Sequence, residues 1–262
     1  ARLMDGKRAG IHWETVGNVL IVTIDNPRRR NALNPEAHYC LAELFDEFSA
    51  HLSIQVAIIT GAGNKAFCAG SDLSVNAGLR RDNLPPSGFG GLAERFDLIK
   101  PVIAAVNGDA IGGGLEIVLA CDLCVADRNS RFALPETRVG LAASGGLHRL
   151  MRQISEKHAK ELALTARMFS AETAYRVGLV NVLCDQGSVL KQALSLAQEI
   201  CKGAPLAVQA TKQMMDQGRE ITELEAAFAE TYSAFEKMIN SKDAIEGREA
   251  FLKKREPQWR SE

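Results

Sequence analysis

A glutamate, Glu116, follows three consecutive glycines in an otherwise apolar segment, NGDAIGGGLEIVLACD (107–122). The glycines, Gly112 to Gly114, lie between a predicted strand and a predicted helix. A glycine turn lets the backbone approach a ligand closely, and the first N–H groups of a helix lack partners and bind negative charge. The spacing fits neither the GxGxxG motif nor a P-loop. A binding turn and mere tight helix packing both remain open on these residues alone.

A second segment, GAGNKAFCAGSDL (61–73), has the same character. It also follows a predicted strand, is rich in Gly and Ala, and ends in SDL at a predicted helix start. Two such turns can direct two backbone N–H groups at one point. One preorganised donor stabilises a developing oxyanion by about 3 to 4 kcal/mol, so a pair suits chemistry that forms an enolate or an acyl oxyanion.

The elements that must position these turns alternate between strand and helix. Short β-branched or apolar runs predict strands, while an Asn N-cap and a proline at the first helical position predict a helix over 34–50. The predicted strands are 18–24, 55–60, 101–106 and 123–127, and a further helix is predicted over 114–121. This alternation predicts an α/β core with right-handed crossovers.

The chain becomes helical from about residue 188. Segments 188–203, 204–218 and 221–239 are amphipathic and rich in helix formers, and each is bounded by Gly, Pro or a polar residue. Packing or subunit assembly is the expected role of this tail. The segment RDNLPPSGFGG (81–91) predicts a mobile surface loop.

Composition excludes several classes of function. The 31 basic and 32 acidic residues give a net charge of −1, and the densest basic run is only Arg28 to Arg30, so neither nucleic acid nor a membrane surface is an expected partner. The first residues lack the apolar stretch of a secretory signal. With six cysteines in 262 residues, free thiols in the reducing cytoplasm are expected. Cys121 and Cys124 form a CxxC pair, but no second pair completes a metal site.

Five segments together resemble the enoyl-CoA hydratase/isomerase (crotonase) superfamily. They are KAFCAGSDL, KPVIAAVNGDAIGGGLEIVLACD, FALPETRVGL, AETAYRVGLVN and DAIEGREAFLKKREPQW, and they occur in family order along nearly the whole chain. The resemblance implies an α/β fold, a crotonase-type spiral of repeated ββα units over residues 1–187. It also implies a helical C-terminal trimerisation region over 188–262 and a homotrimer or dimer of trimers.

The resemblance also implies a site for an acyl-CoA thioester. The backbone N–H groups of Ser71 and Gly113 would form the oxyanion hole. Arg30 and its neighbours would meet phosphate groups of coenzyme A, with Ala32 and Leu33 near the adenine end. Ala69, Asp72 and Leu73 complete the predicted substrate-binding residues. No metal and no cofactor is implied, because coenzyme A is part of the substrate.

Family hydratases carry two glutamates, and Glu116 and Glu136 stand at the matching positions. Adding water across a C=C bond conjugated to a thioester needs a base for the water and an acid for the α-carbon. Two carboxylates in an apolar pocket would titrate separately, leaving one protonated near neutral pH. We therefore predict Glu136 as the proton donor to the α-carbon and Glu116 as the group that activates water.

One loop departs from the family pattern. Hydratases usually have a proline-containing loop similar to GxxPGAGG after VGL, whereas this chain has GLAASGG (140–146), which lacks the proline and is one residue shorter. Because the family loop helps hold the catalytic water, the rate or the preferred substrate is expected to differ.

The segments 85–108 and 243–259 look particularly like the bacterial carnitinyl-CoA dehydratase branch. Enoyl-CoA hydration is the first expectation from the sequence. Carnitinyl-CoA dehydration, enoyl-CoA isomerisation and acyl-CoA hydrolysis are the alternatives within the family, and a weakly active CoA-binding or RNA-binding relative is a further one. The absence of a basic stripe opposes RNA binding.

Overall fold

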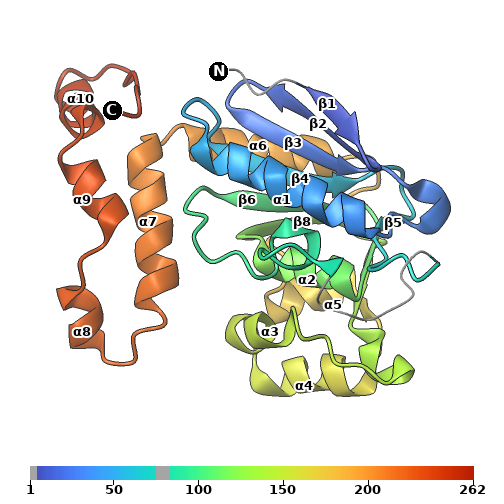
Figure 1. Cartoon of the computed structure of the whole chain (residues 1–262). Coiled ribbons are helices and arrows are strands. Elements are labelled where there is room, and N and C mark those ends of the chain that lie inside the picture. The colour runs from blue at the N-terminus through green and yellow to red at the C-terminus, as the bar shows by residue number, and fades with distance from the viewer. Residues whose placement is uncertain (1–4, 75–82) are drawn as a thin grey trace.

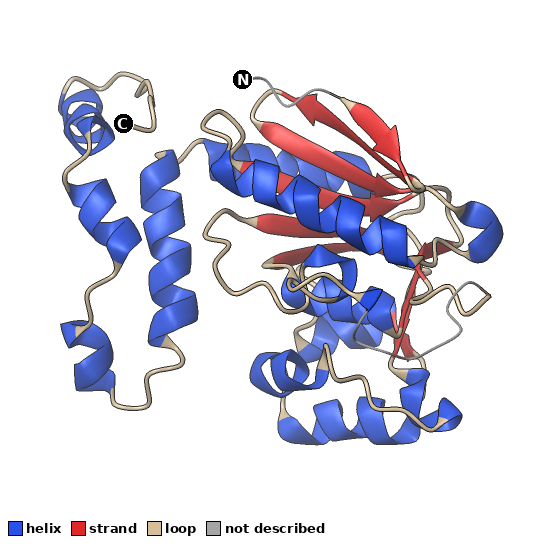
Figure 2. Ribbon diagram, viewed as in Figure 1, coloured by secondary structure: helices blue, strands red, loops and turns tan. Residues whose placement is uncertain are grey.

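The strands form two sheets in a computed structural model that describes residues 5–74 and 83–262 (Figures 1 and 2). The larger sheet has the order β1 (Gly6–Arg8), β2 (Ile11–Val16), β3 (Val19–Ile24), β4 (Val56–Gly61), β6 (Val102–Val106), β8 (Leu123–Asp127) and β11 (Val182–Cys184). The smaller sheet has the order β10 (Phe169–Ser170), β9 (Arg131–Ala133), β7 (Asp109–Ile111) and β5 (Ala66–Cys68).

Consecutive strands are divided between the two sheets. β4, β6 and β8 are parallel neighbours in the larger sheet, and the strand that follows each of them, β5, β7 and β9, is a parallel neighbour in the smaller one. A helix, α2 (Gly113–Ala120), follows β7. This repeated strand–strand–helix unit is the spiral α/β fold predicted from the sequence.

Both faces of the larger sheet are buried at its central strands, β3, β4 and β6. Alternate residues of β3 and β4 point to opposite faces: Leu20 and Ile59 belong to the core shared with α1 (Pro35–Ala50), while Ile21 and Ile58 pack towards α6 (Val189–Cys201). In Figure 1 the sheet accordingly lies between these two helices. Burial on both faces explains why these strands are continuously apolar rather than alternating.

The predicted strands and helices of this core are confirmed. The helix α1 begins as expected, with Asn34 accepting a hydrogen bond from the Ala37 N–H at 2.8 Å and Pro35 in the first turn. Cys121 and Cys124 are buried, and all six cysteines are free thiols, as the sequence predicts. None of the helices in the described part of the chain is long and apolar enough to cross a membrane.

The predicted surface loop over 81–91 is wrong at its C-terminal end, although Asn83 and Pro86 are exposed as expected. Residues 81 and 82 lie outside the described residues, but Phe89, Gly90 and Gly91 form a buried 3-10 turn, η3 (Phe89–Gly91). This turn contacts both α1 and α2. The glycines and prolines suggested a solvated loop, whereas here the glycines allow the backbone to fit between two helices.

The remaining helices come after β9 in the chain. They are α3 (Leu147–Gln153), α4 (Glu156–Thr165), α5 (Ala171–Val177), α7 (Pro205–Gly218), α8 (Leu224–Ala229), α9 (Ser233–Ile239) and α10 (Lys242–Leu252). We refer to α7–α10, residues 205–252, as the arm, because these helices stand to one side of the sheets in Figure 1. The division at residue 188 into core and trimerisation region stays a prediction; α6, which follows that point, packs on the sheet.

The amphipathic segment 221–239 forms two helices and not one, because the chain breaks between α8 and α9. Glu230 and Tyr232 adopt extended conformations there. Gln213 of α7 accepts a hydrogen bond from the Ala234 N–H at 2.8 Å, and the Tyr232 hydroxyl donates to the Ala227 carbonyl at 2.8 Å. One long-range and one local hydrogen bond thus compensate for the interrupted helix, and sequence periodicity does not reveal the long-range one.

Candidate active site

Three turns meet where the parallel strands β5, β7 and β9 end. Ser71 lies just after β5, Gly112 and Gly113 directly after β7, and Glu136 just after β9. The Gly112 N–H donates to the Ala133 carbonyl at 2.9 Å, which ties the last two turns together. Because the carboxyl ends of neighbouring parallel strands share one edge, residues distant in sequence converge there, as at ligand sites of other α/β sheets.

The two N–H groups predicted as oxyanion donors lie at this edge. Gly113 is the first residue of α2, so its N–H has no acceptor within the helix. Gly70 adopts a φ of +93°, and a Cβ there would lie 3.3 Å from the Gly113 nitrogen. Leu33 and Ser71 form a parallel bridge whose bonds use the N–H groups of Leu33 and Asp72, at 2.8 and 2.9 Å, and not that of Ser71.

Glu116 is buried on the first turn of α2, with 7% of its surface exposed. Its Oε1 accepts a hydrogen bond from the Gly145 N–H at 3.2 Å. Burial, followed by the charge of Glu136, raises the pKa of Glu116 to about 7 in spite of that hydrogen bond, and Glu94 adds a smaller effect in the same direction. A carboxyl group with this pKa can both bind and release a proton near neutral pH.

Glu136 lies in the 3-10 turn η4 (Pro135–Val139) and is half-buried. A Cβ on Gly112, whose φ is +57°, would lie 2.8 Å from the Glu136 Oε1, so only glycine fits there without displacing the carboxylate. The Oε2 atom is buried with no hydrogen-bond partner in the described part of the chain. Burial raises the pKa of Glu136 as well. The two predicted acids therefore lie in one electrostatically coupled site.

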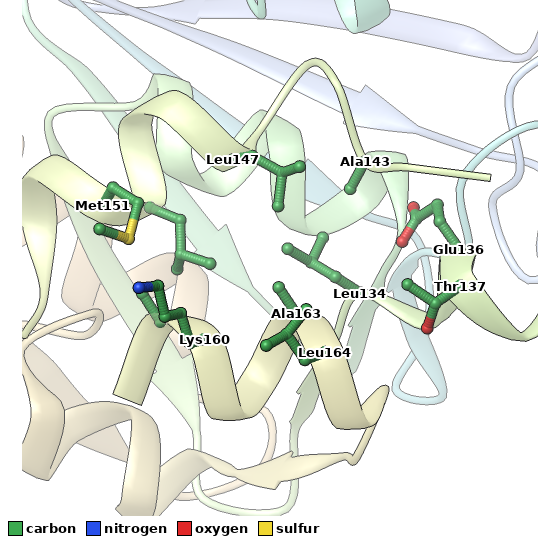
Figure 3. A pocket seen from close by; sticks show the side chains of 11 residues that line it. Leu134, Glu136, Thr137, Ala143, Leu147, Met151, Lys160, Ala163 and Leu164 are labelled. Atoms are coloured by element: carbon green, nitrogen blue, oxygen red, sulfur yellow. The ribbon is translucent and has the colours of Figure 1, made fainter. Parts of the chain in front are cut away.

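An apolar cavity of about 310 Å³ lies beside Glu136, between η4, α3 and α4 (Figure 3). Figure 3 shows Glu136 and Thr137 at one end and Met151 and Lys160 at the other. The side chains between them are aliphatic and include Leu147 and Leu164. Such a chamber can hold an apolar group attached to a substrate whose reacting atoms lie near the carboxylates.

The predicted coenzyme A residues are brought beside the oxyanion turn. Arg30 is exposed in a left-handed conformation with a φ of 51°, and its carbonyl accepts from the Ala69 N–H at 3.0 Å. Ala32 and Ala69 are half-buried. Leu33, in contrast, has its side chain in the hydrophobic core.

The segment after Ser71 turns back on itself. The Asp72 carboxylate accepts hydrogen bonds from the Ser74 N–H and hydroxyl at 3.0 and 2.6 Å, and these bonds lower the pKa of Asp72. Leu73 is exposed. Ser71 takes part in a β-bridge, and residues 75–82, where the predicted helix would continue, lie outside the described residues.

Sequence reasoning missed the role of the loop 140–146 in holding Glu116. Besides the Gly145 N–H bond, a Cβ on Gly145 would lie 2.6 Å from the Glu116 Oε2, and one on Gly146 would lie 3.0 Å from the Glu116 Cγ. The loop therefore contacts the carboxylate through glycine backbone. The two consecutive glycines that follow the PE dipeptide at a short distance were the available signal.

Comparisons with known proteins agree on one family. The family described as enoyl-CoA hydratase/isomerase matches residues 14–262. A carnitinyl-CoA dehydratase of Salmonella heidelberg (strain SL476) is 40% identical over 257 residues, which are 95% of this chain and 98% of that protein.

Solved structures with these names have the same fold. An enoyl-CoA hydratase from Mycobacterium tuberculosis H37Rv has a TM-score of 0.91 and 40% identity, over 97% of this chain and all of the other. A carnitinyl-CoA hydratase from Mycobacterium avium has a TM-score of 0.76 and 38% identity, over 98% of this chain and all of the other.

Proposed function

The chain belongs to the enoyl-CoA hydratase/isomerase family, and on that premise we propose that it adds water reversibly across the 2,3 double bond of a 2-enoyl-CoA thioester. The observation that carries this proposal is the pair of coupled carboxyl groups, Glu116 and Glu136, at the strand edge that also bears the Ser71 and Gly113 N–H groups. The two carboxyl groups suit acid–base chemistry, and the two N–H groups suit the stabilisation of a developing negative charge.

The thioester oxygen would accept hydrogen bonds from the Ser71 and Gly113 N–H groups. As the C=C bond is attacked, negative charge moves onto this oxygen and forms an enolate. Donors that are fixed before the reaction stabilise the enolate more than the substrate, which lowers the barrier. Coenzyme A would extend past the Arg30–Leu33 segment, where Arg30 is available to its phosphate groups.

The two glutamates would move one proton each. Glu116 takes a proton from water as the oxygen bonds to C3, and Glu136 gives a proton to C2. A hydroxyl group and a hydrogen have then been added, Glu116 is protonated and Glu136 is ionised, and proton exchange restores the starting state. In the dehydration direction the roles are exchanged. The charge of Glu136 raises the pKa of Glu116, which supports a state in which only one of the two groups is ionised.

The apolar cavity beside Glu136 supports a substrate with an apolar acyl group. Carnitinyl-CoA dehydration is the second candidate, and the 40% identity to a carnitinyl-CoA dehydratase favours it. That acyl group carries a trimethylammonium cation, for which an aliphatic chamber offers little compensation for lost hydration. We therefore rank an uncharged 2-enoyl group first.

Assembly as a homotrimer or a dimer of trimers is part of the proposal. The arm leaves large apolar side chains in solvent, with 85% of Phe228 and 83% of Phe251 exposed. Apolar surfaces of this kind are characteristic of protein interfaces, and a second copy of the chain is the proposed partner.

The test is the loss of enoyl absorbance on incubation with crotonyl-CoA, a longer enoyl-CoA and crotonobetainyl-CoA. We expect the wild type to hydrate an uncharged substrate, and Glu116→Gln and Glu136→Gln each to lower the rate by about 10²- to 10⁴-fold. Glu47→Gln, at an exposed position of α1, is the control and should keep the wild-type rate.

Product analysis separates the remaining alternatives. A shifted double bond without added water would identify an isomerase, and free coenzyme A would identify a hydrolase. Faster turnover of crotonobetainyl-CoA than of both uncharged substrates would reverse the ranking of the two candidates. Binding of all three substrates without any turnover would contradict the hydratase proposal.

A further inference from the structure

The turn η3 lies between α1 and α2 and leaves no room for side chains at its glycines. Gly90 and Gly91 have φ values of +63° and +69°. A Cβ on Gly90 would lie 2.7 Å from the Ile117 Cδ1 of α2, and one on Gly91 would lie 2.6 Å from the Ala42 nitrogen of α1. The turn therefore packs tightly between the two helices, and its position depends on both of them.

His38 of α1 is joined to this turn by a buried hydrogen bond. Its side chain is almost inaccessible, at 1% exposure, and its Nδ1 accepts from the Gly90 N–H at 2.9 Å. Burial lowers the pKa of His38 to about 4, so the imidazole is neutral at pH 7. Since Nδ1 is the acceptor, the proton resides on Nε2. Removing the acceptor would leave the Gly90 N–H buried and unpaired, which is unfavourable.

Phe89 extends the connection to the predicted oxyanion hole. Its ring packs edge-on against the His38 ring, with centroids 4.4 Å apart. On its other side, the ring fills the space that a side chain on Gly113 would enter. A continuous set of contacts therefore runs from His38, through Phe89 and Gly90, to the first turn of α2, which begins at Gly113.

We propose that His38 is a positioning residue that fixes the Gly113 N–H, through the Gly90 hydrogen bond and the Phe89 ring, in the direction needed to polarise a thioester carbonyl. The inference rests on the proposed function, because it assumes that Gly113 is an oxyanion donor. His38 itself touches no substrate. Its expected effect is on kcat more than on KM, because a misdirected donor weakens stabilisation of the enolate more than binding of coenzyme A.

Four variants separate positioning from stability. His38→Phe keeps a ring but removes the acceptor, whereas His38→Asn offers an oxygen near the former Nδ1. Phe89→Leu leaves the Gly90 hydrogen bond in place and removes the ring next to Gly113. Cys40→Ala is the matched control, because Cys40 is buried on the same helix and its thiol faces the Arg8 carbonyl instead.

Two measurements are made on each folded variant. The first is kcat and KM for crotonyl-CoA. The second is the infrared carbonyl band of bound butyryl-CoA labelled with ¹³C at the thioester carbon, a saturated compound that cannot be hydrated. Two directed N–H donors shift this band to lower frequency relative to free butyryl-CoA, so the band reports polarisation independently of turnover.

We expect His38→Phe and Phe89→Leu to lower kcat by up to about 100-fold, with a much smaller change in KM and a partial loss of the band shift. His38→Asn should recover most of the wild-type kcat and most of the band shift, and Cys40→Ala should match the wild type in both. The inference is overturned if His38→Phe keeps the wild-type kcat and band. It is also overturned if Cys40→Ala or His38→Asn loses as much as His38→Phe.

The wild type distinguishes a failure of this inference from a failure of the proposed function. A wild type that shifts the butyryl-CoA band but hydrates no enoyl-CoA contradicts the hydratase proposal alone, and the band then decides the role of His38. A wild type that binds butyryl-CoA without shifting its band contradicts the oxyanion hole, and the inference fails with it.

Discussion

The first turn of α2 and the arm differ in how completely their own chain covers them. At α2, Leu115 has no exposed surface, and a Cβ on Gly114 would overlap the Cys68 carbonyl oxygen of β5. In the arm, 72% of Leu224 is exposed, and Phe228 and Phe251 are more exposed still. The first turn of α2 is therefore packed by contacts within one chain, whereas the arm presents apolar surface that the described part of the chain does not cover.

The largest difference is expected when one substitution is made in both regions. Leu115→Ala should lower the free energy of unfolding by about 2 to 5 kcal/mol, because it leaves a cavity in a packed core. Leu224→Ala should change it by less than about 0.5 kcal/mol in the single chain. Urea unfolding at low protein concentration measures both. Equal losses would show that the two regions are packed alike.

The next largest effect on stability is expected from removing the ionisable group of Glu116 in α2. Because the folded protein raises the pKa of Glu116 from 4.5 to about 7, it binds more protons than the unfolded chain between these values, and its stability falls as pH rises through them. Glu116→Gln cannot ionise, so at pH 8 it should be more stable than the wild type by up to about 3 kcal/mol. This advantage should decline towards pH 4.

Thermal unfolding of the wild type, Glu116→Gln and Glu47→Gln across this pH range provides the measurement. Glu47 is exposed on α1, so its substitution should leave the pH profile of the melting temperature unchanged. An advantage of Glu116→Gln that does not depend on pH would contradict the charge-burial argument.

Replacing one glycine in each region should have a smaller effect. Gly114→Ala should cost about 1 to 3 kcal/mol, since α2 must move away from the Cys68 carbonyl. In α10, a Cβ on Gly247 would lie 3.2 Å from the edge of the Trp259 ring, which can shift. Gly247→Ala should therefore change the stability by no more than about 1 kcal/mol, since alanine also favours helix. A larger loss at Gly247 would show that the arm is as tightly packed as α2.

The smallest change in single-chain stability is expected from Phe228→Ser combined with Phe251→Ser. Surface substitutions usually alter the free energy of unfolding by no more than about 0.5 kcal/mol each. If a second copy covers the arm, light scattering should nevertheless show a lower mass for this variant than for the wild type. An unchanged mass would indicate that these side chains are not part of an interface.

Local sequence signals accounted for much of the fold. Apolar runs predicted the strands β3, β4, β6 and β8, and the Asn34–Pro35 pair predicted the start of α1. The short strands β5, β7 and β9 carry only a few residues each, so periodicity cannot distinguish them from loops. The break between α8 and α9 depends on Gln213, which is about 20 residues away, and the burial of η3 depends on two helices, so neither was visible locally.

By itself, the sequence determined the types of group available at the site: glycine turns that expose N–H groups, and two glutamates in apolar surroundings. Only the tertiary structure decided that the ends of β5, β7 and β9 lie side by side and that Gly145 binds the Glu116 carboxylate. It alone also decided that His38 holds the turn packed against Gly113. The physical reason is that backbone conformation and amphipathicity are encoded by neighbouring residues. Hydrogen bonds and charge coupling between distant residues, in contrast, arise only when parallel strands have been brought together.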